Sequence, residues 1–115
     1  MIIAVEGTKA FNDYPTFMRA MSVAMSQTNS NNEFEIWSAG PYKVTNFAAA
    51  FTNSSENYLR NRGYRIFLKR LPLQFVKDNI SDVNYLASFA KRGEPASHLS
   101  HLASEVGVEV GIFRV

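Results

Sequence analysis

Short apolar runs alternate with segments of helical periodicity along the whole chain. The apolar runs predict β-strands at residues 2–5, 34–37, 64–68, 83–89 and 108–113. Between most of these runs, apolar side chains recur every three or four residues, which predicts amphipathic helices. The polar stretch 27–32 ends the first helix, and residues 73–80 are ambiguous, with one or two helical turns as the interpretation. This alternation predicts a single α/β domain over residues 1–115: a Rossmann-like open parallel sheet of about five strands with helices on both faces.

The ends of the predicted helices carry capping signals. Asp13 and Ser97 are expected to cap helix N-termini, because their side-chain oxygens can accept hydrogen bonds from backbone amides that lack helical partners. Gly63 and Gly107 are expected to end helices, since glycine tolerates the left-handed conformation found there. Inside the second predicted helix, residues 52–55 (Thr-Asn-Ser-Ser) are weak helix formers that would allow a break.

The composition excludes several classes of protein and site. The chain has no cysteine, which rules out a disulfide scaffold, a thiol nucleophile and a cysteine-ligated metal. No apolar run approaches the roughly 18 residues that a membrane span needs, and the N-terminus reaches Glu6 too soon for a signal peptide. We therefore expect no membrane partner and a cytoplasmic location. The net charge of +2 permits anionic partners without requiring them.

Three loops that leave predicted strands could form a ligand site. In open parallel sheets, ligands bind outside the carboxyl ends of the strands, near the point where the strand order reverses. Glycines allow close approach of a ligand, hydroxyls and free amides bind its oxygens, and cations neutralise its charge. The residues expected to bind a ligand are Gly7, Thr8, Lys9, Ser38, Gly40, Lys43, Arg92, Gly93 and Ser97. For any single loop the simpler interpretation is favoured, namely that glycines end strands and lysines are solvated, whereas three such loops on one edge favour a cleft.

Catalytic and metal-binding signals are weak. Glu6 and Glu94 are the only carboxylates placed to act in such a cleft, as a general acid or base. His98 and His101 are spaced to share a metal, but no third ligand has matching spacing, so no metal site is predicted. The sequence favours a protein that is not an enzyme and has no cofactor.

The densest basic region follows the second predicted helix. It could contact RNA, DNA or an acidic protein surface, although a solvated helix end and edge strand is the simpler explanation. Its members are Arg60, Arg62, Arg65, Lys69 and Arg70. Trp37 ends a predicted strand, which favours core packing over stacking on a base.

The opening residues resemble a known family. Residues 7–9 (Gly-Thr-Lys), followed by residues 11–14 (Phe-Asn-Asp-Tyr), are similar to the first motif of SLOG-type domains. These are Rossmann-like relatives of the cytokinin-activating LOG proteins and of the DNA-processing recombination mediator. Residues 37–44 resemble the family's second glycine-rich loop, and residues 89–97 occupy the position of its third. The chain departs from LOG enzymes in lacking the glutamate of their Pro-Gly-Gly-x-Gly-Thr-x-x-Glu stretch, and Thr45 stands where the family usually has an acid. The resemblance therefore implies the fold and a nucleotide-type cleft without phosphoribohydrolase activity.

The length and opening residues are also similar to the small modifiers of host valyl-tRNA synthetase that T-even bacteriophages encode. That resemblance implies a phage accessory protein in the host cytoplasm that binds the synthetase, with or without transfer RNA. Two alternatives stay open: a protein that binds or sequesters a small nucleotide or nucleotide derivative, and a hydrolase of nucleotide N-glycosidic bonds. The oligomeric state is open too, with a homo-oligomer among the alternatives.

Overall fold

The computed structural model describes residues 1–26, 32–40 and 42–115, so the predicted polar stretch 27–32 and Pro41 lie almost entirely outside the described residues. Strands and helices alternate as the sequence predicts. In chain order the elements are β1 (Ile2–Gly7), α1 (Tyr14–Ser26), β2 (Glu33–Ala39), α2 (Lys43–Asn61), β3 (Arg65–Leu71), α3 (Leu73–Asp78), the 3-10 turn η1 (Ile80–Asp82), β4 (Tyr85–Ala90), α4 (His98–Glu105) and β5 (Glu109–Arg114).

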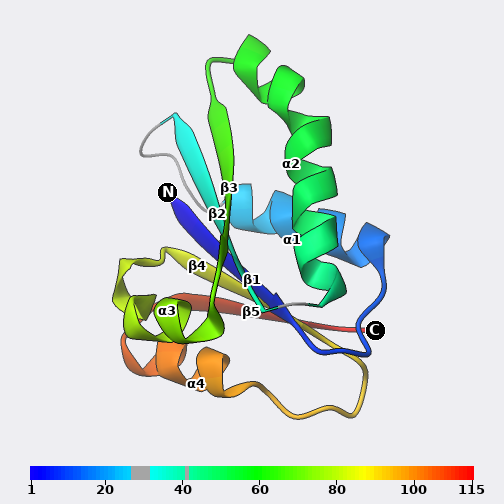
Figure 1. The fold of residues 1–115 in the computed structure, drawn as a ribbon, viewed down its shortest axis with the longest axis vertical. Coiled ribbons are helices and arrows are strands. Elements are labelled where there is room, and N and C mark those ends of the chain that lie inside the picture. Colours follow the sequence, from blue (N-terminus) through cyan, green and yellow to red (C-terminus); the bar gives the residue numbers. More distant parts are fainter. Residues whose placement is uncertain (27–31, 41) are drawn as a thin grey trace.

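The strands form one sheet in the order β3-β2-β1-β4-β5, and every neighbouring pair is parallel (Figure 1). The predicted α/β fold with an open parallel sheet of five strands is therefore confirmed. The chain builds outward from β1 through β2 to β3, then returns to the other side of β1 for β4 and β5. The strand order thus reverses between β1 and β4, which makes that junction the topological switch point.

Strand alternation divides the core between the two faces of the sheet. Ile3 and Val5 of β1 face α1 and α2, where a large aromatic cluster gathers around Phe17. Ala4, the residue between them, belongs to the opposite core with residues of α3, η1 and α4, among them Leu99. In Figure 1, α1 and α2 accordingly lie on one side of the sheet and α3 and α4 on the other.

The predicted helix ends are confirmed. The Thr16 amide donates to Asp13 Oδ1 over 3.0 Å at the start of α1. The Ser100 amide donates to Ser97 Oγ over 3.0 Å at the start of α4. Gly63 and Gly107, with φ angles of 82° and 83°, follow the ends of α2 and α4.

Two local expectations needed structure to resolve them. α2 runs unbroken through residues 52–55, because Phe51 and Leu59 pack onto the core on either side of the weak stretch. The fourth strand begins at Tyr85 and not at the predicted residue 83, since the Val83 amide closes the preceding turn on the Ile80 carbonyl. In the part of the chain that the structure describes, no helix has the length and apolar character to cross a bilayer.

Candidate functional site

The three predicted loops leave neighbouring strands. Val5 pairs with Ser38 of β2, and Gly7 pairs with Phe89 of β4. The Thr8 amide extends the second pairing by donating to the Phe89 carbonyl over 3.0 Å. The carboxyl ends of β2, β1 and β4 therefore lie in a row along one edge of the sheet.

A small crevice opens at the switch point between β1 and β4. Its volume is about 60 Å³, below the roughly 300–1,000 Å³ of typical small-molecule pockets. It is lined by Glu6, Gly7, Thr8, Ser88, Phe89, Ala90, Pro95 and Ser97. We call this the switch-point crevice.

Glu6 is the central polar group of the switch-point crevice. It lies beside Ser88 in the β1–β4 register, and Ser88 Oγ donates to Glu6 Oε1 over 2.9 Å. Ser97 Oγ, which also caps α4, donates to the same oxygen. No hydrogen bond from a described residue reaches Glu6 Oε2. Sequence reasoning missed Ser88, although a serine between apolar neighbours in a buried strand is the kind of signal that marks a polar contact.

Glu94 lies at the rim of the crevice and ties two loops together. Its Oε1 accepts hydrogen bonds from Thr8 Oγ1, over 2.8 Å, and from the Lys91 amide, over 2.5 Å. The bond from the Lys91 amide, then that from Thr8, and the charge of Lys91 lower the pKa of Glu94 below its ordinary value. A carboxylate held in its charged form by internal donors is a poor general acid.

The second loop faces away from the crevice. Ser38 shares the sheet face of Ile36, and its buried hydroxyl bonds Thr45 Oγ1 over 2.7 Å at the start of α2. Thr45 Oγ1 also donates to the Gly40 carbonyl over 2.8 Å. The structure therefore brings Glu6, Thr8 and Ser97 together but places Ser38 and Gly40 against α2.

The remaining predicted ligand residues serve the backbone or lie on the surface. A Cβ at Gly7 would lie 3.1 Å from Val44 Cβ, so this glycine allows α2 to pack closely against β1. Gly93 has a φ of 93°, a turn conformation that glycine favours. Lys9, Lys43 and Arg92 are exposed on the surface, and none of them lines the crevice.

The charges near the switch point do not favour a phosphate. In Rossmann-like folds the amides at the start of the first helix receive the anion. Here the Asp13 carboxylate caps that helix, and Glu6 and Glu94 line the crevice or its rim. His98 and His101 are exposed on α4, and across residues 1–26, 32–40 and 42–115 no group of three or more metal-ligating side chains occurs.

Three of the five cations in the basic region at the end of α2 and along β3 form ion pairs. Arg60 forms an ion pair with Glu56 over 2.9 Å. On β3, Arg65 pairs with Glu33 and Lys69 pairs with Glu35, each over 3.1 Å. Burial alone would raise the pKa of Glu35. Hydrogen bonds from Trp37 and Lys69, together with the charge of Lys69, instead lower this pKa below its ordinary value.

Exposed aromatic rings accompany these arginines. The Arg62 guanidinium lies 3.8 Å above the ring centre of Tyr58, and that of Arg65 lies 5.2 Å from the ring centre of Phe67. Tyr58 and Phe67 are 57% and 38% exposed. We call Tyr58, Arg60, Arg62, Tyr64, Arg65 and Phe67 the β3 surface.

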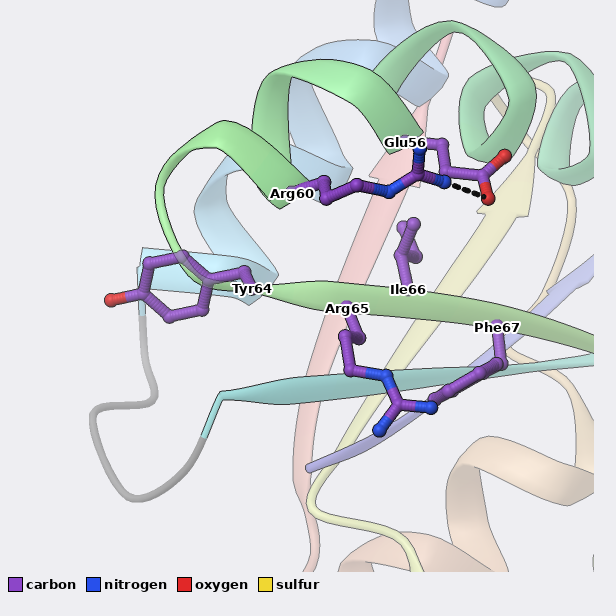
Figure 2. A pocket seen from close by; sticks show the side chains of 6 residues that line it. All are labelled: Glu56, Arg60, Tyr64, Arg65, Ile66 and Phe67. Atoms are coloured by element: carbon purple, nitrogen blue, oxygen red, sulfur yellow. Dashed lines mark hydrogen bonds and ion pairs between the residues drawn. The ribbon is translucent and has the colours of Figure 1, made fainter.

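A shallow pocket of about 220 Å³ opens within the β3 surface. Figure 2 shows Ile66 directed toward the Glu56–Arg60 pair on α2, whereas Arg65 and Phe67 point to the other side of β3. Tyr64 extends away from the pocket at the end of the strand (Figure 2). The predicted basic strip is thus a mixed surface of aromatic rings and paired charges.

Comparisons with protein-family models, with curated proteins and with solved structures find no match for this chain.

Proposed function

We propose that this chain is a protein-binding domain whose partner is a bacterial valyl-tRNA synthetase, contacted through the β3 surface. The observation that carries the proposal is the set of exposed aromatic rings stacked with arginines on that surface. Tyrosine and arginine are enriched among residues that dominate protein–protein binding energy, and stacking already restricts their side chains before a partner arrives.

The paired charges favour a protein over a nucleic acid as the partner. Affinity for nucleic acid comes mainly from cations that replace the counterions of phosphates. Arg60, Arg65 and Lys69 each have a carboxylate oxygen within 3.1 Å, so three of the five cations of the predicted basic region are already paired. An aromatic surface with locally balanced charge suits the core and rim of a protein interface.

The small size of the switch-point crevice also favours a protein, and not a small molecule, as the main partner. Its volume is about 60 Å³, and one oxygen of the Glu6 carboxylate, Oε1, already accepts hydrogen bonds from two serine hydroxyls. The identity of the partner rests on the resemblance of the chain's length and opening residues to the phage modifiers of that synthetase.

The proposal is tested with the two purified proteins. We expect a complex by analytical gel filtration, with affinity measured by calorimetry. The double variant Tyr58→Ala/Phe67→Ala should weaken it at least tenfold, since interface hot spots each contribute about 2 kcal/mol or more. The matched control is Val106→Ala, which removes an equally exposed apolar side chain at the end of α4.

Absence of a complex at micromolar concentrations would remove the synthetase as the partner. A complex that the double variant leaves unchanged, while thermal melting shows it folded, would remove the β3 surface. We expect no binding of transfer RNA to the chain alone at 150 mM salt; binding with a steep salt dependence would point instead to a nucleic-acid interface.

One observation favours a second candidate function, the binding of a small hydroxyl-rich ligand such as a nucleoside. Glu6 Oε2 lies at the switch point without a partner among the described residues and could accept a hydrogen bond from a ribose hydroxyl. Adenosine, NAD and ADP-ribose at 100 times their dissociation constants would add about 2.7 kcal/mol to the free energy of unfolding. Thermal melts should show this shift in the native chain and not in Glu6→Gln. No shift with any of the three would reject the candidate.

A further inference from the structure

A groove runs along the outer edge of β5, the edge of the sheet opposite to β3. Its volume is about 490 Å³, the size of an ordinary binding pocket. One wall is a stripe of α1, and the other is the end of β5 with the residue that follows it. The lining residues are Thr16, Arg19, Val23, Ile112, Phe113, Arg114 and Val115.

The β5 edge of this groove is open. β5 is the last strand of the sheet and pairs only with β4 among the described strands. An exposed edge strand presents backbone donors and acceptors to any segment that lies beside it. Adding a strand to such an edge is a common way for proteins to bind extended peptides.

The groove offers apolar contact on both faces of an added strand. Phe113 packs with the α1-side core and stacks on Phe89 at 5.4 Å between ring centres, so Ile112 and Arg114 lie on the other face by strand alternation. Val23 of α1 and Ile112 are 44% and 43% exposed, although both are apolar. Each face of the edge therefore has an uncovered apolar side chain beside it.

Two arginines without an ion pair among the described residues flank the groove. Arg19 bonds only the hydroxyl of Thr16, and Arg114 Nε donates to the Glu94 carbonyl, not to its carboxylate. Neither guanidinium has a carboxylate within ion-pair distance among the described residues, in contrast to Arg60 and Arg65 on the β3 surface. One arginine flanks the groove on the α1 side and the other on the opposite face.

We infer that this groove binds an extended, acidic segment of a partner protein, which adds to β5 as a sixth strand. Its backbone pairs with the open edge, its apolar side chains contact Val23 and Ile112, and its carboxylates pair with Arg19 and Arg114. The inference goes beyond the proposed function and does not depend on which protein carries the segment.

The test uses a defined probe in place of an unknown partner. The probe is an eight-residue capped peptide in which pairs of valines alternate with pairs of glutamates, so that each face carries both kinds of side chain. Titrated into the isotope-labelled chain, it should shift the amide resonances of Arg19, Val23, Ile112 and Arg114, with a dissociation constant below 1 mM. A peptide with lysine in place of glutamate should bind at least tenfold more weakly.

Two further arms separate the parts of the inference. The double variant Arg19→Glu/Arg114→Glu should reverse the preference, losing the glutamate peptide and gaining the lysine peptide, which a merely unfolded variant cannot do. A glutamate peptide with every backbone amide N-methylated should not bind, because it has no backbone donor left to pair with the edge on either side.

Absence of shifts at 5 mM peptide, shifts confined to the β3 surface, or equal binding of the glutamate and lysine peptides would overturn the inference. Undiminished binding of the N-methylated peptide would overturn strand addition. The synthetase is absent from this experiment, so its outcome is separate from that of the proposed function.

Discussion

At the scale of single residues, several buried or half-buried hydroxyl groups among the described residues connect separate elements of the fold. Ser38 and Thr45 bond one another beneath α2, and Ser88 and Ser97 both donate to Glu6. Thr52 departs from this pattern: its Oγ1 is buried within α2 and has no hydrogen-bond partner among the described residues. A buried polar group without a partner loses its hydration without compensation.

We expect Thr52→Val to raise the free energy of unfolding by about 1 kcal/mol, because it removes an unsatisfied oxygen at nearly constant volume and helix propensity. Urea denaturation measures the change. Thr45→Val is the matched control, since the same exchange there leaves Ser38 without its partner and should cost about 1–3 kcal/mol. Equal effects of the two substitutions would contradict this account.

Tyr85 of the neighbouring strand β4 leaves no room for a side chain at Gly111. A Cβ at this position would lie 2.1 Å from the Tyr85 hydroxyl oxygen and 2.8 Å from the Phe113 ring. Gly111→Ala should therefore destabilise the fold by about 1–3 kcal/mol, as overpacked cores do. In the Tyr85→Phe background the cost should be clearly smaller, because the closest atom is gone. Additive effects in this double-mutant cycle would show that the hydroxyl is not the obstacle.

Tyr85 also predicts a pH dependence at the alkaline end. Burial, and after it the charge of Glu109, raises the pKa of Tyr85 above its ordinary value of 10.0. The unfolded chain then loses this proton at a lower pH than the folded chain, so the free energy of unfolding falls as pH rises through 10. Denaturation at pH 8–11 should show the decline, and it should be reduced in Tyr85→Phe. An identical pH profile in that variant would exclude this tyrosine as the cause.

At the scale of elements, the helix starts connect the fold to the candidate site. Ser97 caps α4 and donates to Glu6 of β1, so one side chain joins a helix to the central strand at the switch point. On the other face, Thr45 in the first turn of α2 holds Ser38 of β2. Hydrogen bonds therefore connect helices on both faces of the sheet to the carboxyl ends of its strands.

Ser97→Asp distinguishes capping from the contact with Glu6. Aspartate caps a helix as well as serine does, but here its carboxylate would face that of Glu6. We expect destabilisation at pH 7 that disappears in the Glu6→Gln background, because the second negative charge is then gone. Ser97→Ala removes the cap together with the hydrogen bond to Glu6, so in either background it should cost at least the loss of about 0.5–2 kcal/mol expected for a cap. Stability of Ser97→Asp equal to the native chain at pH 7 would contradict the geometry.

The sequence predicts an interaction well when the two residues lie close together along the chain. The caps at Asp13 and Ser97 depend on residues three positions away, and both were predicted correctly. The direction of Ser38 depends on strand register and on the approach of α2, which no local pattern reveals. The same limit applies to the ion pairs of Arg65 and Lys69 with β2, which connect residues about thirty positions apart. The common edge of the three loops, by contrast, followed from strand–helix alternation alone.

At the scale of the whole molecule, the sheet separates two cores of different character. The α1–α2 side holds a connected set of rings in which Phe17 contacts Phe47, Phe51 and Phe89. The α3–α4 side is built from smaller residues such as Ala4, Ala39 and Ala103, together with Trp37. The two outer strands, β3 and β5, lie at opposite edges of the sheet, so the β3 surface and the β5 groove do not overlap.

Trp37 lies in the core on the α3–α4 side of the sheet, so its fluorescence reports on that core. It is the only tryptophan in the chain, 6% exposed, and its indole contacts Phe75 of α3 edge-on, 5.8 Å between ring centres. Its fluorescence should peak at short wavelength in the native chain and respond to loosening of α3, whereas near-ultraviolet circular dichroism of the phenylalanine and tyrosine rings reports on the opposite layer. Following both signals along one denaturation curve will reveal whether the two layers melt together or in sequence.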